Sequence, residues 1–225
     1  EMLRSLVGSE MCIRDRHMVE EFFLVQSRYS AAIKEIQTKL EILDDEFQMR
    51  HRRNPIHHMQ SRLKTIQSML EKLKRKNYEV SINSAVKNLQ DIAGIRVICS
   101  YVQDVYTIAN LLVSQDDVHL VRMADYIREP KPNGYRSLHL IVEIPVFLSE
   151  GRILVPVEVQ IRTIAMDFWA SLEHSLRYKA QEYIPQHISD ELQRVATDIA
   201  SLDQRMQAIH DQVDELSDAR SDNAT

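Results

Sequence analysis

The chain has 225 residues, of which 44% are hydrophobic, with only 4 Gly and 6 Pro, a composition that excludes a disordered protein. Its formal net charge of −5 argues against a dedicated nucleic-acid-binding protein. Two cysteines exclude a disulfide framework, and no apolar run approaches the roughly 18 residues of a membrane span, so we expect a cytoplasmic protein without membrane contact.

The N-terminal part of the chain is predicted to be helical. Residues 1–17 begin without Met and show no periodicity, so we expect a non-native, disordered leader. Apolar residues then recur at three- and four-residue steps from Tyr29 to Phe47, which predicts a long amphipathic helix. After Asn54-Pro55 a second stripe runs from Met59 to Leu73 and predicts a second helix. This helix is expected to carry a basic and polar flank made of Arg62, Lys64, Ser68, Lys72 and Arg75.

The central part of the chain has the pattern of strands mixed with helices. Strands are expected at 95–101, 118–121, 138–146 and 153–161, with helices at 105–113 and 164–179. This order predicts an α/β (α+β) fold, with a mixed sheet of about five strands flanked by helices. Residues 18–185 are expected to form one domain with its N-terminal helices.

The C-terminal part is predicted to be one amphipathic helix over residues 186–216, followed by a disordered tail over 217–225. Its apolar positions form a heptad-like seam, which needs an apolar partner, either the first helix or another subunit. The seam residues are Leu192, Val195, Ile199, Leu202, Met206, Ile209, Val213 and Leu216.

Two acidic residues stand at neighbouring strands. Asp91 precedes the strand that begins near Gly94, and Glu158 lies inside the strand 153–161. Because side chains alternate along a strand, Glu158, Gln160 and Arg162 share the face opposite Val157. That face is either a functional site or an ordinary polar surface. Two such acids are able to hold Mg²⁺, which uses one or two carboxylates together with phosphate oxygens.

The segment from Lys131 to His139 contains a Pro-Asn-Gly turn that presents Tyr135 between cationic side chains at the mouth of a strand. An exposed tyrosine ring at this place suits stacking on a base. The alternative is a simple hairpin turn, with His139 as a hydrogen-bonded core histidine.

Four segments together resemble the synthetase domain of RelA/SpoT proteins, over residues 29 to 179. They occur in the family's order, and within the family they are closer to the RelP branch than to the RelQ branch. The resemblance implies a small, single-domain alarmone synthetase with a nucleotidyltransferase-like fold. The segments are 91–96 (Asp-Ile-Ala-Gly-Ile-Arg), 131–139 (Lys-Pro-Asn-Gly-Tyr-Arg-Ser-Leu-His), 158–163 (Glu-Val-Gln-Ile-Arg-Thr) and 169–174 (Trp-Ala-Ser-Leu-Glu-His).

The resemblance also implies an activity, the transfer of pyrophosphate from ATP to the 3′-hydroxyl of GDP or GTP, and a role for each site residue. Asp91 and Glu158 are the implied catalytic residues and Mg²⁺ ligands, with Glu158 as base, metal ligand or both. The implied ATP-binding residues are Arg62, Lys64, Ser68, Lys72, Arg75 and Arg96. The implied GDP- or GTP-binding residues are Arg122, Lys131, Asn133, Tyr135, His139, Gln160 and Arg162.

Two positions depart from the family pattern. Ala124 occupies a position that is often basic, where Arg122 is a substitute, and residues 58–61 lack the sequence with which the RelQ branch binds its allosteric product. Product activation is therefore not predicted. We expect a homo-oligomer, a tetramer as in related small synthetases.

Three alternatives stay open at this point. A catalytically silent nucleotide- or RNA-binding module would use the same basic residues, but it has no need for Asp91 and Glu158 among phosphates. RNA binding as a second activity is left open and is not predicted. An alarmone hydrolase is suggested only by His210-Asp211, without further ligands. The C-terminal helix is alternatively a scaffold for another protein.

Overall fold

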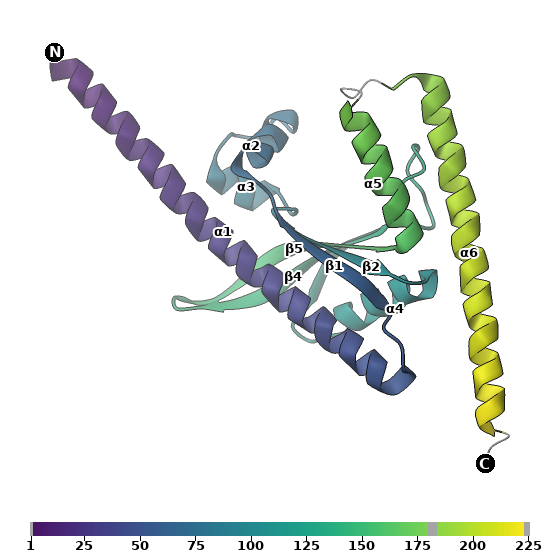
Figure 1. Ribbon diagram of the computed structural model, residues 1–225. Coiled ribbons are helices and arrows are strands. Elements are labelled where there is room, and N and C mark those ends of the chain that lie inside the picture. The colour runs from purple at the N-terminus through teal and green to yellow at the C-terminus, as the bar shows by residue number, and fades with distance from the viewer. Residues whose placement is uncertain (1, 180–183, 223–225) are drawn as a thin grey trace.

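The computed structural model describes residues 2–179 and 184–222, with side chains described over 21–179 and 184–216. Figure 1 shows a central sheet with a long helix at each end of the chain, and α1 begins and α6 ends at opposite ends of the molecule. The elements are α1 (Met2–His51), β1 (Ile56–Leu63), α2 (Ile66–Arg75), α3 (Ile82–Asn88), β2 (Ala93–Cys99), α4 (Val102–Val113), β3 (His119–Asp125), β4 (Leu138–Leu148), β5 (Gly151–Thr163), α5 (Ile164–Lys179) and α6 (Gln186–Asp222).

The sheet is mixed, as the sequence predicts, with the strand order β1-β2-β5-β4-β3. Strands β2 and β5 are parallel and central, and the other three pairs are antiparallel. A tight hairpin joins β4 to β5 at Gly151, whose φ of +123° lies in a region that side chains rarely adopt. The connection that brings β5 beside β2 is what places Glu158 next to Gly94.

One face of the sheet packs against α1 and α4, which also contact each other. The alternation predicted for β5 is confirmed, because Val157, Val159 and Ile161 are completely buried in this core. Helix α1 contributes the apolar stripe that its periodicity predicts, from Tyr29 to Leu43. Burial of these apolar faces on one side of the sheet leaves the polar side of β5 for other uses.

The prediction that the second helix begins near Met59 is wrong. Residues 56–63 form the edge strand β1, antiparallel to β2, and helix α2 begins only after Thr65, whose Oγ1 accepts a hydrogen bond from Ser68 N at 3.3 Å. The apolar spacing fits a helix, but the backbone N–H and C=O groups along the edge of β2 need hydrogen-bond partners, and another strand supplies them. Arg62 therefore lies on a strand, and not on the helix that carries Ser68 and Lys72.

The boundaries expected at the two ends stay predictions. Helix α1 begins at Met2 and runs through the expected leader, and α6 continues to Asp222 within the expected tail. The structure does not describe the side chains of residues 2–20 and 217–222. Within the part of the chain that the structure describes, no helix combines the length and the apolarity that crossing a membrane would require.

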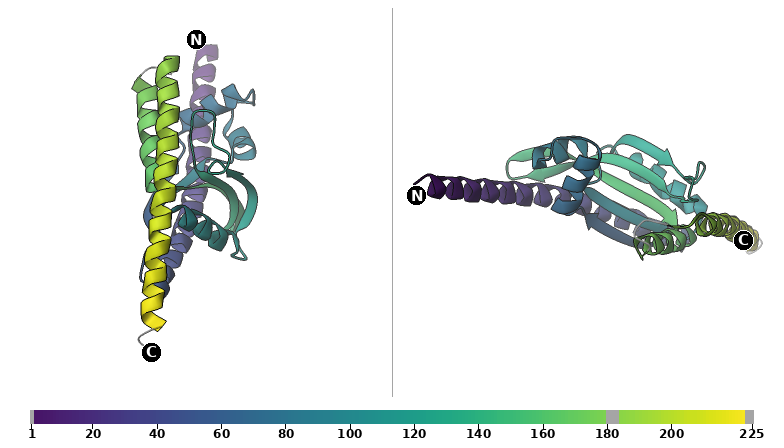
Figure 2. Two further views of the ribbon diagram at one scale, coloured as in Figure 1. Left: turned by 90° about the vertical axis from the view of Figure 1, so that its right-hand side faces the viewer. Right: turned by 90° about the horizontal axis from the view of Figure 1, so that it is seen from above.

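Helix α6 packs on α5 and α4, and Figure 2 shows α5 and α6 side by side. Its buried residues are Ala196, Ala200 and Asp203, and Asp203 Oδ2 accepts a hydrogen bond from Thr163 Oγ1 at 2.7 Å. The alternative that α1 covers the apolar seam is wrong. Most seam side chains are exposed in the single chain, among them Leu202, Met206, Ile209 and Leu216.

A buried ion pair joins the segment between α1 and β1 to α4, and it gives a test of the fold. Arg53 donates to both carboxylate oxygens of Asp104, at 3.0 and 2.7 Å, and Asp104 is only 1% exposed. We expect Arg53→Met to lower the free energy of unfolding by about 3 kcal/mol, because the substitution leaves a buried carboxylate unpaired. Urea denaturation measures the change. Arg194→Met is the matched control, since the pair of Arg194 with Glu191 is exposed, and equal losses in the two variants would contradict this account.

Candidate functional site

The polar face of the sheet, opposite α1, carries two rows of side chains that cross all five strands. Residues that lie opposite each other on paired strands point to the same side of the sheet. Each row therefore runs across the sheet, with a residue of the middle strand, β5, at its centre. The first row is Arg62, Gly94, Glu158, Ile141 and Arg122. The second row is Gln60, Arg96, Gln160, His139 and Ala124.

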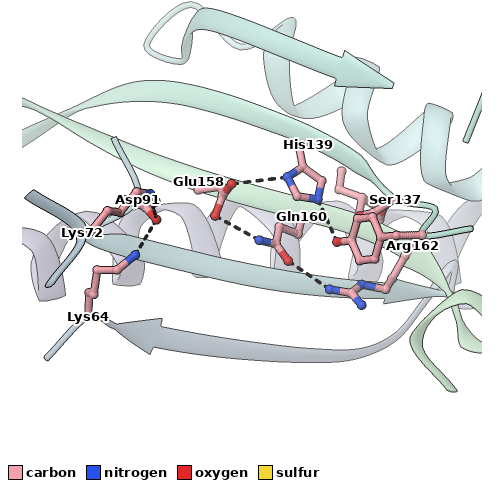
Figure 3. A network of polar contacts seen from close by, with 10 residues as sticks. Lys64, Lys72, Asp91, Ser137, His139, Glu158, Gln160 and Arg162 are labelled. Atoms are coloured by element: carbon pink, nitrogen blue, oxygen red, sulfur yellow. Dashed lines mark hydrogen bonds and ion pairs between the residues drawn. The ribbon is translucent and has the colours of Figure 1, made fainter. Parts of the chain in front are cut away.

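Glu158 is the centre of a continuous hydrogen-bonded network (Figure 3). Gln160 Nε2 donates to Glu158 Oε2 at 3.0 Å, and Arg162 donates to Gln160 Oε1 at 2.9 Å. On its other side, Glu158 Oε1 lies 3.3 Å from His139 Nδ1. His139 Nε2 lies 2.9 Å from the hydroxyl of Tyr135. The network links the carboxylate to the ring that the sequence predicts to stack on a base.

The surroundings of Glu158 keep it ionised. Burial by itself raises the pKa of this carboxyl, but the hydrogen bond and charge of His139 and the amide of Gln160 outweigh it, and the pKa lies below its ordinary value. Burial raises the pKa of Tyr135, whose hydroxyl therefore keeps its proton at neutral pH. At neutral pH the carboxylate of Glu158 thus carries a negative charge and is able to accept a hydrogen bond from a hydroxyl group.

Asp91 lies just before β2, between two ammonium groups. Lys64 Nζ and Lys72 Nζ are each 2.5 Å from its Oδ2. Burial raises the pKa of Asp91, but these two hydrogen bonds and charges outweigh it, so the pKa lies below its ordinary value. The second oxygen, Oδ1, is buried without a hydrogen-bond partner in the described chain. A buried carboxylate oxygen of this kind is suited to a ligand that brings positive charge or a donor.

Two adjoining pockets open on the polar face. The first has a volume of about 200 Å³ and is lined by both acids, together with Lys64, Gly94 and Ile95. The second has a volume of about 360 Å³ and is lined by Tyr135 and Arg162 and by α5. A shared wall made of Arg62, Arg96 and Gln160 separates them. Gly94 has no side chain, which keeps the floor of the first pocket open beside Glu158.

The loop 131–135 presents Tyr135 to the second pocket. Gly134, with a φ of +89°, allows the turn in which Gly134 N donates to Lys131 O at 2.8 Å. Lys131 Nζ lies 4.5 Å from the centre of the Tyr126 ring and 4.8 Å from that of Tyr135. The buried Arg162 guanidinium lies 5.6 Å from the Tyr135 ring. Two cations therefore lie close to this ring, which suits an anionic aromatic ligand.

Some predicted site residues line neither pocket. Ser68, Lys72 and Arg75 lie on α2, and of these Lys72 is joined to the first pocket through Asp91. Arg122 is exposed at the edge strand β3, in the row of Glu158. His139 reaches the site through Glu158. Their predicted contacts with nucleotides stay predictions.

Helix α5 contributes residues that sequence reasoning did not select. Asp167 Oδ1 lies 3.7 Å from Arg96 and 3.4 Å from Arg162, so it orients two cations of the site. The second pocket is also lined by α5 residues at helical spacing: Ala170, Ser171, Glu173 and His174. The motif at 169–174 was visible in the sequence, but only the packing of α5 on β5 and β2 shows which of its side chains reach the pocket.

The donor set fits Mg²⁺. Among the described residues no group of three or more His, Cys, Asp and Glu side chains is arranged for a metal ion. Mg²⁺ does not need such a group when phosphate oxygens supply the remaining ligands. Asp91 and Glu158 both line the first pocket, and the buried Oδ1 of Asp91 has no competing partner in the described chain. Both are hard oxygen donors, as this ion prefers.

Comparison with known proteins places the chain in a family. Residues 61–183 match the family described as the region found in RelA/SpoT proteins. GTP pyrophosphokinase YwaC of Bacillus subtilis is 45% identical over 83% of this chain and 89% of its own length. GTP pyrophosphokinase YjbM of the same species is 38% identical over 89% of this chain and 93% of its length. The crystal structure of the Bacillus subtilis small alarmone synthetase 1 bound to its product pppGpp superposes with a TM-score of 0.78, at 37% identity, and covers 87% of this chain and 98% of that one.

The pKa of Asp91 predicts how pH affects stability. Because its pKa is lower in the folded chain than in the unfolded one, Asp91 stabilises the fold fully above the unfolded value of about 4, and this contribution is lost as pH falls through the folded value. We expect the stability difference between the wild type and Asp91→Asn to be constant between about pH 5 and 7 and to shrink below about pH 4. Urea denaturation at a series of pH values checks this. A difference that grows on acidification would contradict it.

Proposed function

Because the chain belongs to the RelA/SpoT protein family, we propose that it transfers the β,γ-pyrophosphate of ATP to the 3′-hydroxyl of GDP or GTP, which yields (p)ppGpp. The observation that carries this proposal is the position of Glu158, an ionised carboxylate that lines the first pocket and accepts a hydrogen bond from Gln160, which lines both pockets. The two similar Bacillus subtilis proteins, both named GTP pyrophosphokinases, support the same reaction.

The first pocket and the adjoining α2 are proposed to bind ATP. Arg62 and Arg96 flank the adenine, and the side chains of Lys64, Ser68, Lys72 and Arg75 surround the phosphates. Pyrophosphoryl transfer spreads negative charge over several oxygens, so fixed cations stabilise the transition state without a covalent intermediate. Lys64 and Lys72 are already held in place by Asp91, which limits the rearrangement that nucleotide binding requires.

The second pocket is proposed to bind the acceptor nucleotide. Guanine stacks on Tyr135, whose ring lines the pocket beside Arg162 and Gln160. The cations Arg122, Lys131 and Arg162 then face the acceptor's phosphates and ring. In this arrangement the ribose lies between the pockets, near the shared wall and Glu158.

Asp91 and Glu158 are proposed to hold Mg²⁺, with Asp91 Oδ1 as the free ligand oxygen. The bound ion would neutralise charge on the β- and γ-phosphate oxygens. The chain's own residues do the remaining work. Lys64 and Lys72 keep Asp91 ionised, and His139 and Gln160 orient the carboxylate of Glu158.

Glu158 is proposed to act on the attacking hydroxyl. Its carboxylate accepts the hydrogen of the 3′-hydroxyl, and the 3′-oxygen forms a bond to the β-phosphorus of ATP. The bond between the β-phosphorus and the oxygen that bridges it to the α-phosphorus breaks, and AMP leaves with the electron pair. The proton is transferred to Glu158 or remains shared with it, depending on how far this carboxylate also serves as a metal ligand.

We propose that the acting form is a homo-oligomer, a tetramer as in related small synthetases. Helix α5 exposes Ile164, Phe168, Leu172 and Leu176 on one side, and the seam of α6 is also exposed. Two helices that both expose large apolar side chains are unusual for a monomer and suit a symmetric interface. A cytoplasmic location, where ATP and guanine nucleotides are available, and the assignment to the RelP branch also stay predictions.

The first experiment tests the reaction. Incubation with Mg²⁺, γ-labelled ATP and either GDP or GTP, followed by anion exchange, should place label in guanosine tetra- or pentaphosphate. We expect Glu158→Gln to lower kcat by at least about 100-fold, because the amide cannot accept the proton, with little change in KM for ATP. Chelation of Mg²⁺ should abolish product. Nucleotide or RNA binding without labelled product would instead favour a silent binding module.

The second experiment tests the assembly. Light scattering should show an oligomer for the wild type, and the double variant Leu202→Glu with Ile209→Glu should shift the mass towards the monomer, because both side chains lie on the exposed seam. The exposed polar site Gln204→Glu on the same helix is the control. A wild-type monomer at micromolar concentration would sink the proposal, and capture of a different protein by this helix would favour the scaffold alternative.

A further inference from the structure

We propose that Glu173 is a positioning residue for the acceptor nucleotide, and that it acts by fixing the loop 131–135 through Asn133 rather than by touching guanine. This inference rests on the proposed function of the second pocket. Glu173, on α5, is 8% exposed although it carries a carboxylate, and it lines the second pocket while it accepts a hydrogen bond from Asn133 in the loop that presents Tyr135. Burial of a carboxylate is costly because desolvation disfavours its charge, so partners that compensate for this cost are expected nearby.

The side chain of Asn133 is engaged at both ends. Its Nδ2 donates to Glu173 Oε1 at 3.1 Å, and its Oδ1 accepts from the backbone N–H of Tyr135 at 3.2 Å. The amide therefore has one orientation in which both bonds form, with its nitrogen towards α5. Asn133 spans from α5 to the backbone of Tyr135, so its amide shapes the turn, and its predicted contact with the acceptor nucleotide stays a prediction.

A nearby cation, Arg177, forms an ion pair with Glu173. Arg177, one turn further along α5, donates its Nε to the same Oε1 that accepts from Asn133. A charge-assisted acceptor holds its donor more firmly than a neutral one. Because the two donors meet at one oxygen, Arg177 fixes Glu173, and Glu173 fixes Asn133.

The opposite side of the loop is supported by α6. A side chain cannot be added at Gly134 without displacement, since its Cβ would lie 2.6 Å from the Cβ of Ala196. Trp169 lies 3.7 Å from the same position, and its Nε1 donates to Leu192 O at 2.9 Å, which joins α5 to α6. The turn is thus held between two helices, with Glu173 as its only charged hydrogen-bond acceptor among these contacts.

The position of the loop matters for the reaction because Asn133 is connected to the catalytic carboxylate through Tyr135. Tyr135 lines the acceptor pocket, and its hydroxyl contacts His139, which contacts Glu158. Release of Asn133 would let the Tyr135 backbone move, and both the stacking surface and the support of the carboxylate would change. Among the described residues, Glu173 is one of those that line the second pocket and not one of those that line the first.

The experiment measures KM for the acceptor and for ATP separately. We expect Glu173→Ala to raise KM for GDP about tenfold, the effect of losing one charge-assisted hydrogen bond, with KM for ATP unchanged. Glu173→Gln keeps an acceptor oxygen for Asn133 and should restore most of the affinity. Asn133→Ala also removes the bond to the Tyr135 backbone and should raise KM for GDP at least as much as Glu173→Ala. The double variant should be no worse than Asn133→Ala alone, because Glu173 acts only through Asn133.

A second acceptor separates positioning from direct recognition. Inosine diphosphate lacks the 2-amino group of guanine, so a carboxylate that binds this group directly would discriminate between the two nucleotides. If Glu173 only positions the loop, Glu173→Ala raises KM for GDP and KM for inosine diphosphate by the same factor. Loss of discrimination in the variant would overturn the inference in favour of direct contact.

Other outcomes are equally distinct. An unchanged KM for GDP in Glu173→Ala, or an equal rise in KM for ATP, would also overturn the inference, the latter because it indicates general loosening of the fold. Thermal unfolding of each variant shows whether it folds. If Glu173→Ala does not fold, Arg177→Met is the milder variant, because it removes only the supporting charge. Absence of product from the wild type would refute the proposed function itself, and not the positioning role alone.

Discussion

The parallel pairing of β2 with β5 is the constraint on which the rest of the site depends. It sets Gly94 beside Glu158 and Arg96 beside Gln160, in the middle of a sheet whose other face is closed by α1 and α4. Because side chains alternate along a strand, burial of Val157 and Val159 against the core directs Glu158 and Gln160 to the polar face. A shift of one residue in this register would move every site residue of β5 into the core.

Charge on the polar face is balanced locally. Asp91 has two lysines, Glu158 has His139 and Gln160, and Asp167 lies between Arg96 and Arg162. Each group is partly buried, and its charge is tolerated because an opposite charge or a donor is adjacent. The same arrangement that stabilises the site offers a phosphate-rich ligand cations that are already oriented, so little rearrangement is needed on binding.

Sequence periodicity failed where long-range partners decide the structure. The stripe through Met59 and Leu63 fits a helix, yet these residues form strand β1 because the edge of β2 is open. Helix α3 was not predicted, since its seven residues are too few for a periodic signal. Glu173 lay within a recognised motif, but a sequence does not show that its carboxylate meets Asn133, 40 positions away.

The sequence by itself determined the fold class, the alternation of β5, the two acids and the tyrosine loop, because these depend on local periodicity and turn chemistry. The sequence also contains four motifs in the family's order, and these identify the family although most other positions differ from those of its relatives. Only the tertiary structure decided that Arg62 comes from a strand and Lys72 from a helix, and that both meet the site through Asp91 and the shared wall. The reason is physical: hydrogen bonds across strands and the packing of helices join residues far apart in the chain, and no local pattern encodes those distances.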